Sequence, residues 1–189
     1  MISSQDRSGW FGASDVGYIM GNWNTKSFKD WWLTKLGLNT KHFTNTAMNA
    51  GTYYEGRILD VVGSKRRDHQ ILIPELLLRI NLDGDSPLQI DEIKTHKADK
   101  QFKVTKQYWQ QVQVQCFGKL QEEGRVPSAT IHAYGLKEDD YKNFFNEIDH
   151  KRLTHHPVIY DPAFIKQFLS RLEYLRDCLK KGVFPNGTA

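Results

Sequence analysis

The sequence predicts an α/β fold in which helices flank a mixed central β-sheet. Two observations support this prediction. Helical patterns of apolar residues precede and follow a pair of strand-like segments, and the last third of the chain adds another alternating segment and a long amphipathic helix. The 189 residues are most simply one domain, residues 1–189, which is long enough for a substantial core.

Two short helices are expected near the N-terminus. Ser14 or Asp15 is a suitable cap for a helix that ends near Met20. A second helix is expected over residues 27–36, because Gly37 supplies a typical C-terminal stop.

The strongest helical pattern covers residues 46–62. Its apolar stripe consists of Ala47, Gly51, Tyr54, Ile58 and Val62. Gly51 has low helix propensity, so we expect another segment to pack closely against it. Glu55 lies one turn further along, where it either faces solvent or supplies an acidic group to a site.

A hairpin is expected next. Leucine and isoleucine alternate with other residues over 76–83, which predicts a strand with one buried face. Residues 84–87 have turn chemistry and residues 88–95 read as the returning strand. Residues 71–73 form a further strand or extend the first one.

Carboxylates and a lysine are expected to converge at this hairpin. Glu92 and Lys94 are two residues apart, so they project to the same side of a strand, and the turn brings Asp83 beside them. Converging carboxylates bind hard cations such as Mg²⁺ or Mn²⁺, which activate water and neutralise charge on a phosphate. A nearby lysine orients the water or stabilises the oxyanion. The alternative is an exposed hairpin with ordinary surface charges.

The remaining segments complete the expected fold. Residues 104–120 predict a helix with an apolar stripe and a polar stripe of Tyr108, Gln111 and Gln115. Residues 128–136 alternate as a strand, and residues 161–181 form an amphipathic helix. Residues 139–150 fit no single pattern. The apolar stripe of the last helix consists of Phe164, Phe168, Leu172, Leu175 and Leu179.

Composition agrees with a protein of the cytoplasm and permits binding to polyanions without being diagnostic of it, so the distribution of the charges matters more than their sum. The net charge is +4, and Lys97 and Lys100 belong to a lysine series that follows the hairpin. The sequence contains no apolar run of membrane length, and its first residues show no hydrophobic signal region. We therefore expect no membrane association. Cys116 and Cys178 lie far apart on helical apolar stripes, which indicates buried thiols in a reducing compartment.

Six short motifs lie in one order between residues 7 and 115. They are Arg7-x-Gly9 with Ala13-Ser14-Asp15, Trp32-x-x-Lys35-x-Gly37, Gly51-x-x-x-Glu55, Asp83-Gly84, Glu92-Ile93-Lys94 and Tyr108-x-x-Gln111-x-Gln113. With these motifs the chain resembles the phage lambda exonuclease and YqaJ-type viral recombinase group of the PD-(D/E)XK nuclease superfamily. The resemblance covers about the first 60% of the chain, and the C-terminal third carries no recognised motif.

The resemblance implies a restriction-endonuclease-like core and a set of catalytic residues. The metal ligands would be Asp83, Glu92, Glu55 and the main-chain carbonyl of Ile93, with Lys94 as the catalytic lysine. Gln111 would support the site. Asp85 and Asp91 flank the expected acids, so Asp85 is an alternative to Asp83 as the first carboxylate; we favour Asp83 because a strand precedes it and Gly84 follows it.

The resemblance also implies contacts with DNA. Arg7 and Ser14 match positions that grip the 5′-terminal phosphate. The polar stripe of the helix over residues 104–120 separately makes Tyr108 and Gln115 candidates for DNA contact; its side chains either only aid solubility or position a carboxylate, a water or the DNA backbone. The lysines at 97 and 100 would bind the polyanionic substrate.

The implied activity is a Mg²⁺-dependent 5′→3′ exonuclease on duplex DNA ends, with Mn²⁺ as an alternative metal. It leaves 3′ overhangs for a single-strand annealing protein in phage recombination, within the bacterial host cytoplasm. A homo-oligomer, by resemblance a trimeric ring, is expected. Two other hypotheses stay open, which are a restriction-type or junction-resolving endonuclease on the same core and a non-catalytic module that binds DNA or loads a recombinase.

Overall fold

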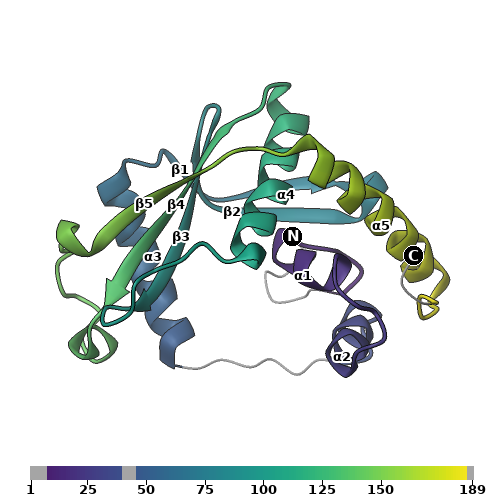
Figure 1. Cartoon of the computed structure of the whole chain (residues 1–189), viewed down its shortest axis with the longest axis horizontal. Helices are drawn as coiled ribbons and strands as arrows, with labels where there is room; N and C mark the ends of the chain where they lie inside the picture. Colours follow the sequence, from purple (N-terminus) through teal and green to yellow (C-terminus); the bar gives the residue numbers. More distant parts are fainter. Residues whose placement is uncertain (1–7, 40–45, 187–189) are drawn as a thin grey trace.

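The structure is a computed structural model that describes residues 8–39 and 46–186. Within them the chain forms a five-stranded sheet of order β1-β2-β3-β4-β5 with helices on both faces (Figure 1). The strands are β1 (Arg66–Ile73), β2 (Leu78–Ser86), β3 (Gln89–Lys97), β4 (Ser128–Leu136) and β5 (Leu153–Val158). The main helices are α1 (Val16–Ile19), α2 (Lys26–Lys35), α3 (Thr46–Val62), α4 (Lys106–Glu123) and α5 (Pro162–Lys181).

The sheet is mixed, as predicted. The pairs β1–β2, β2–β3 and β4–β5 are antiparallel, whereas β3 and β4 are parallel. Parallel neighbours need a crossover, and α4 supplies it. This connection places α4 across the sheet directly after β3, which carries the predicted catalytic residues.

Two hydrophobic cores lie on opposite faces of the sheet. The larger one joins β1 and β2 to α1, α2, α4 and α5, and the smaller one lies between α3, β3 and β4 (Figure 1). Gly51 of α3 faces β3, where an added Cβ would lie 3.3 Å from the Thr95 hydroxyl oxygen. The close approach predicted at Gly51 is therefore confirmed.

Several predicted elements agree with the structure. The helix over residues 46–62 and the strand over residues 128–136 have the predicted bounds. The C-terminal helix starts after Asp161, whose carboxylate accepts the main-chain N–H groups of Ala163 and Phe164. All five apolar residues predicted to line that helix are buried. Cys116 and Cys178 are buried free thiols, and burial raises the pKa of Cys116 to about 12.

The predicted hairpin turn is wrong in its bounds. β2 continues through Gly84 to Ser86, so the turn consists of Pro87 and Leu88. Gly84 is required by packing rather than by a turn, because a Cβ there would lie 2.3 Å from a methyl carbon of Leu59 on α3. The sequence analysis also missed β5, an edge strand that includes Pro157.

Among the described residues, no helix has both the length and the apolar character that crossing a membrane requires.

Candidate active site

The site lies where β2 and β3 separate. The two strands pair only near their turn, from Ser86↔Gln89 to Gly84↔Asp91. Beyond that point β2 pairs with β1 and β3 pairs with β4. Asp83 lies at the point of separation, and its Oδ2 accepts the main-chain N–H of Ile93 at 2.9 Å. The fold therefore brings Asp83 next to Glu92, as the sequence predicts.

Helix α4 holds Glu92 in place. The Glu92 side chain is 1% exposed. Its Oε1 accepts the Nε2 amide of Gln111 at 2.6 Å, and its Oε2 accepts that of Gln115 at 2.6 Å. The two glutamines are four residues apart, so they lie on one face of the helix. Gln111 contacts Glu92, and its supporting role in the reaction stays a prediction. The prediction that Gln115 contacts DNA is corrected, because Gln115 is fully buried against Glu92.

Lys94 is held by a carboxylate and an aromatic ring. Its Nζ donates to Glu92 Oε1 and lies 5.2 Å from the ring centre of Tyr108. Tyr108 in turn stacks on Phe102, with ring centres 6.0 Å apart and an interplanar angle of 5°. Burial alone would lower the pKa of Lys94, but the charges of Glu92 and Asp83 raise it, so the side chain is an ammonium. Tyr108 thus positions Lys94, and its contact with DNA stays a prediction.

Negative charge accumulates at the site. Burial raises the pKa of Asp83 well above its ordinary value, and the charges of Glu92 and Glu55 raise it further. Burial also raises the pKa of Glu55, on α3, with additional contributions from Asp68 and Glu92. Glu55 therefore lies near enough to Asp68 and Glu92 for their charges to act on it, and its role as a metal ligand stays a prediction. Such mutual repulsion is what a bound cation would relieve.

Asp68 of β1 is an acid of the site that the sequence analysis missed. Its neighbours pair as Arg67↔Gly84 and His69↔Leu82, which places Asp68 across from Asp83. Its φ is 51°, a left-handed conformation that costs a non-glycine residue about 1 kcal/mol or more. Its charge contributes more to the raised pKa of Glu55 than the charge of Glu92 does. No sequence signal marked it, because it follows two arginines in what looks like a charged loop.

The donor set suits a hard divalent cation. Asp83, Glu92, Glu55 and Asp68 offer carboxylate oxygens, and these with the Ile93 carbonyl are the ligand types that Mg²⁺ and Mn²⁺ prefer. Among the described residues, no group of three acidic, histidine or cysteine side chains is already arranged around a metal position. The oxygens of Glu92 are engaged by α4 and Lys94. The residues fit the metal by donor chemistry and by charge.

A cavity of about 270 Å³ opens beside the carboxylates. Its lining includes Asp83, Gln111 and Ser14. Buried cations, Lys35 and Arg79, also line it. Ser14 thus lines the same cavity as Asp83, and its contact with a terminal phosphate stays a prediction. Arg7, the other predicted phosphate ligand, lies outside the described residues.

A buried ion pair builds the Ser14 side of this cavity. Asp15 accepts Lys35 Nζ at 2.5 Å and the indole N–H of Trp31 at 2.9 Å. It also accepts the main-chain N–H of Gly12 at 2.7 Å, and Lys35 donates to the carbonyl of Trp10 at 2.8 Å. The Ala13-Ser14-Asp15 motif and the Trp32-x-x-Lys35-x-Gly37 motif are distant in the sequence. Their ion pair fixes the loop that contains Trp10 and Gly12.

The acids that flank the site belong to other clusters. Asp85 is fully buried and accepts Lys119 Nζ at 2.5 Å and an Arg66 guanidinium nitrogen at 2.5 Å. Burial would raise the pKa of Asp85, but hydrogen bonds from Lys119, Arg66 and His69 lower it below its ordinary value. Asp85 is therefore a structural ion-pair residue, which favours Asp83 as the first carboxylate, and the metal-binding role of Asp83 stays a prediction.

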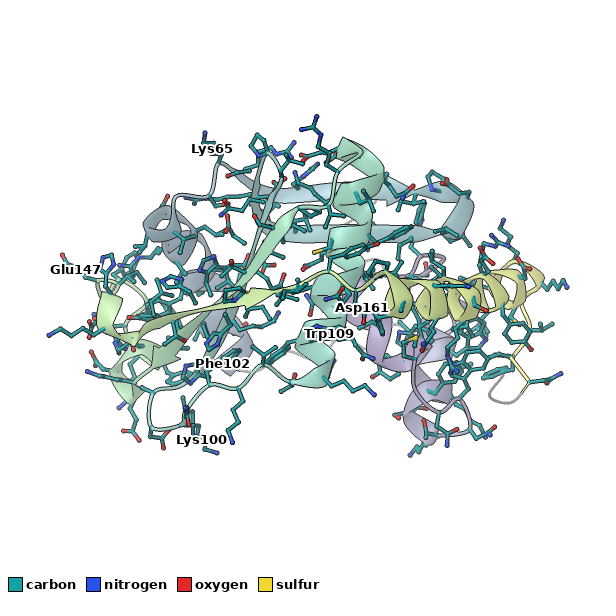
Figure 2. The ribbon with its side chains drawn as sticks, turned by 45° about the horizontal axis from the view of Figure 1, so that its top comes forward. Lys65, Lys100, Phe102, Trp109, Glu147 and Asp161 are labelled. Atoms are coloured by element: carbon teal, nitrogen blue, oxygen red, sulfur yellow. The ribbon has the colours of Figure 1, made fainter. Side chains whose placement is uncertain are left out.

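The predicted DNA-binding lysines are exposed. Lys97 ends β3, and Lys100 lies in the loop that leads to α4, at the edge of the molecule (Figure 2). Phe102 follows in the same loop (Figure 2) and contacts the rings of His96 and His156, with ring centres 5.4 and 5.0 Å away. The lysines are accessible to a polyanion, and their role in binding DNA stays a prediction.

Fold and site together define an α/β core with a mixed sheet flanked by helices, whose acids meet where two sheet strands separate. The predicted fold class is thus confirmed. The structure is similar to the alkaline exonuclease LHK-Exo from Laribacter hongkongensis, with TM-score 0.66, 18% identity and coverage of 93% of this chain and 90% of that one. It is also similar to a phage-related exonuclease from Haemophilus somnus 129PT, with TM-score 0.63, 15% identity and coverage of 91% and 95%.

A further structure, LHK-Exo in complex with dAMP, has TM-score 0.65 and 18% identity, and the match covers 94% of this chain and 91% of that one. No protein-family model matches the sequence, and no curated protein matches it. At these identities the similarity shows a shared fold.

The crowding of acids predicts that Asp83→Asn stabilises the metal-free protein. Asparagine keeps an oxygen to accept the Ile93 N–H but removes one of the repelling charges. In EDTA we expect an unfolding free energy higher by about 0.5–2 kcal/mol. We expect Mg²⁺ to raise the melting temperature of the wild type and to have little effect on the variant. The exposed Asp99→Asn is the control, and lower stability of Asp83→Asn in EDTA would contradict the repulsion.

Proposed function

We propose that the protein is a Mg²⁺- or Mn²⁺-dependent exonuclease that degrades one strand of duplex DNA from its 5′ end. The observation that carries this proposal is the convergence of Glu55, Asp83 and Glu92 around Lys94, beside a cavity that Ser14 borders. Carboxylates with a lysine at this point of the sheet suit metal-assisted hydrolysis of a phosphodiester.

The comparisons support the same proposal. The solved structures that share the fold over nearly the whole chain are exonucleases, and one of them holds dAMP. A deoxynucleoside monophosphate is the unit that an exonuclease releases. We place the terminal phosphate in the cavity of about 270 Å³ that Asp83, Ser14 and the buried cations Lys35 and Arg79 line.

The chain's own residues prepare the reaction. A metal held by Asp83, Glu92 and the Ile93 carbonyl, with Glu55 and Asp68 nearby, would supply an acidified water and neutralise developing negative charge. The Lys94 ammonium donates a hydrogen bond to the attacking water or to the phosphate oxygens. Gln111 and Gln115 hold Glu92 in one orientation, and Tyr108 limits the motion of Lys94.

Contacts outside the reaction centre complete the proposal. Lys97 and Lys100 would attract the DNA backbone, in keeping with a net charge of +4. The 3′ overhang would pass to a single-strand annealing protein during phage recombination, in the host cytoplasm. A trimeric ring would keep the enzyme on its substrate. These points follow from the resemblance and are part of the proposal.

Two alternative functions differ from the proposed exonuclease in the substrates that they would cut. An endonuclease on the same core would cut closed circular duplex, and a binding module would cut nothing. A terminal phosphate in the cavity that Ser14 lines would favour action at an end over action within a duplex.

The end-directed reaction predicts a strong preference for linear over closed circular duplex. Removing the 5′ phosphate from a linear substrate is expected to slow cleavage several-fold in the wild type and to matter less in Ser14→Ala, because that hydroxyl faces the phosphate. Degradation of labelled substrates on gels measures both effects, with the exposed Ser170→Ala as the control. Circular duplex cut as fast as linear duplex would rule out the exonuclease.

A further inference from the structure

A pair of histidines lies on the sheet face opposite to Glu92 and Lys94. His132 of β4 and His155 of β5 are direct cross-strand partners. Their Nδ1 atoms are 2.7 Å apart, and their rings are nearly perpendicular at 81°. His132 is 6% exposed, whereas His155 is exposed to solvent. The pair is therefore anchored on one side and open on the other.

A buried carboxylate fixes the orientation of His132. Its Nε2 lies 3.1 Å from Oδ1 of Asp91, which is fully buried on β3. Gln89 donates to the same oxygen at 2.7 Å. A carboxylate at this position keeps the imidazole proton on Nε2, so the lone pair of His132 Nδ1 points toward His155. This carboxylate–histidine arrangement is the one that supports metal-ligating histidines in proteins.

We propose that His132 and His155 bind one divalent transition-metal ion through their Nδ1 atoms, with water in the remaining positions. The two Nδ1 atoms are 2.7 Å apart, so both can reach one ion after small movements of the rings. Neutral imidazole nitrogens are ligands that Cu²⁺, Ni²⁺ and Zn²⁺ accept, and Cu²⁺ is bound most tightly of the three.

Binding exchanges one hydrogen bond for two coordinate bonds. Without metal, one Nδ1 must donate to the other, and the lone pair of His132 makes His155 the donor. On binding, the rings turn so that both lone pairs meet at the ion, and His155 carries its proton on Nε2 instead. Its imidazole therefore stays neutral and no net proton is released.

The histidine pair is chemically distinct from the carboxylate site. Imidazole nitrogens suit Cu²⁺ and Ni²⁺, whereas carboxylate oxygens suit Mg²⁺ and Mn²⁺. Successive residues of a strand face opposite sides, so Asp91 and Glu92 serve different faces of β3. Excess Mg²⁺ would thus fill the carboxylate site and leave the histidines free.

The test is calorimetric titration of Ni²⁺ into the full chain in excess Mg²⁺. The wild type is expected to bind one equivalent, and His155→Ala, an exposed position, to bind it at least about 10-fold more weakly. His156→Ala, one residue along β5 and on its other face, should bind as the wild type does. Asp91→Asn is expected to weaken binding by about 10–100-fold.

A spectroscopic measurement makes the assignment independent of affinity. One equivalent of Cu²⁺ should give an electron paramagnetic resonance spectrum with hyperfine structure from two nitrogens, absent in His155→Ala and present in His156→Ala. The proposal would be overturned if the wild type bound no Ni²⁺ or if His155→Ala bound it unchanged. In those cases the His132–His155 contact is a structural hydrogen bond.

Discussion

Lys94→Ala is expected to lower the rate of DNA cleavage by about 10²–10³-fold, the typical effect of removing one preorganised donor from an active site. Lys94 contacts Glu92 and Tyr108 and is the ammonium placed among the acids. Its loss removes the hydrogen-bond donor for water and phosphate but leaves the carboxylates able to hold a metal. Single-turnover cleavage of a labelled duplex measures the effect.

Two further variants show whether the charge itself matters. Lys94→Met keeps the packing against Tyr108 and is expected to be as inactive as Lys94→Ala. Lys97→Ala removes an exposed lysine of the same strand, and we expect it to weaken DNA binding at most several-fold without changing the cleavage of bound DNA. A Lys94 variant with near wild-type single-turnover rate would remove this lysine from the mechanism.

Lys119→Met is expected to cost about 3 kcal/mol of unfolding free energy, the lower end of the range for breaking a buried ion pair. Lys119 and Asp85 are both fully buried and 2.5 Å apart. Methionine fills the space but leaves Asp85 with only Arg66 and His69. In a chain of this size the loss corresponds to a melting temperature lower by roughly 6–12 °C. Lys103→Met, on the surface, should change stability by less than about 0.5 kcal/mol.

The effect of Lys119→Met should depend on pH in a defined direction. The folded-state pKa of Asp85 is lowered, so its contribution to stability is fully present above its unfolded pKa of about 3.9 and is lost as pH falls through the folded pKa. Urea unfolding at neutral pH and near pH 3 is expected to show the difference between wild type and variant narrowing in acid. A difference that widened in acid would contradict the assigned ion pair.

Periodicity predicted the bounds of α3 and β4. In α3 the buried residues Ala50, Tyr54 and Ile58 follow one face of the helix. In β4 both faces are buried from Ile131 to Leu136, and the strand was recognised from its apolar alternation alone.

β5 was missed because Thr154, His155, His156 and Pro157 give no apolar alternation, and an edge strand needs none. Gly84 was read as a turn because its actual constraint, contact with Leu59 of α3, is made between distant segments.

The catalytic candidates were more predictable than their surroundings. Glu92 and Lys94 are two apart on one strand, so local geometry alone places them together. The roles of Asp68 and Gln115 depend on which strand and helix pack beside them, and no spacing rule reports that. The choice between Asp83 and Asp85 likewise required the ion pair with Lys119 to be seen.

The central claim is tested most directly by digesting linear duplex DNA labelled at its 5′ or 3′ end, with Mg²⁺ or with EDTA. The proposed function predicts early, Mg²⁺-dependent release of the 5′ label as mononucleotide, while the 3′ label stays on long single strands. Early release of the 3′ label or internal cuts would contradict the proposed polarity. An intact duplex in Mg²⁺ and in Mn²⁺ would contradict the nuclease itself.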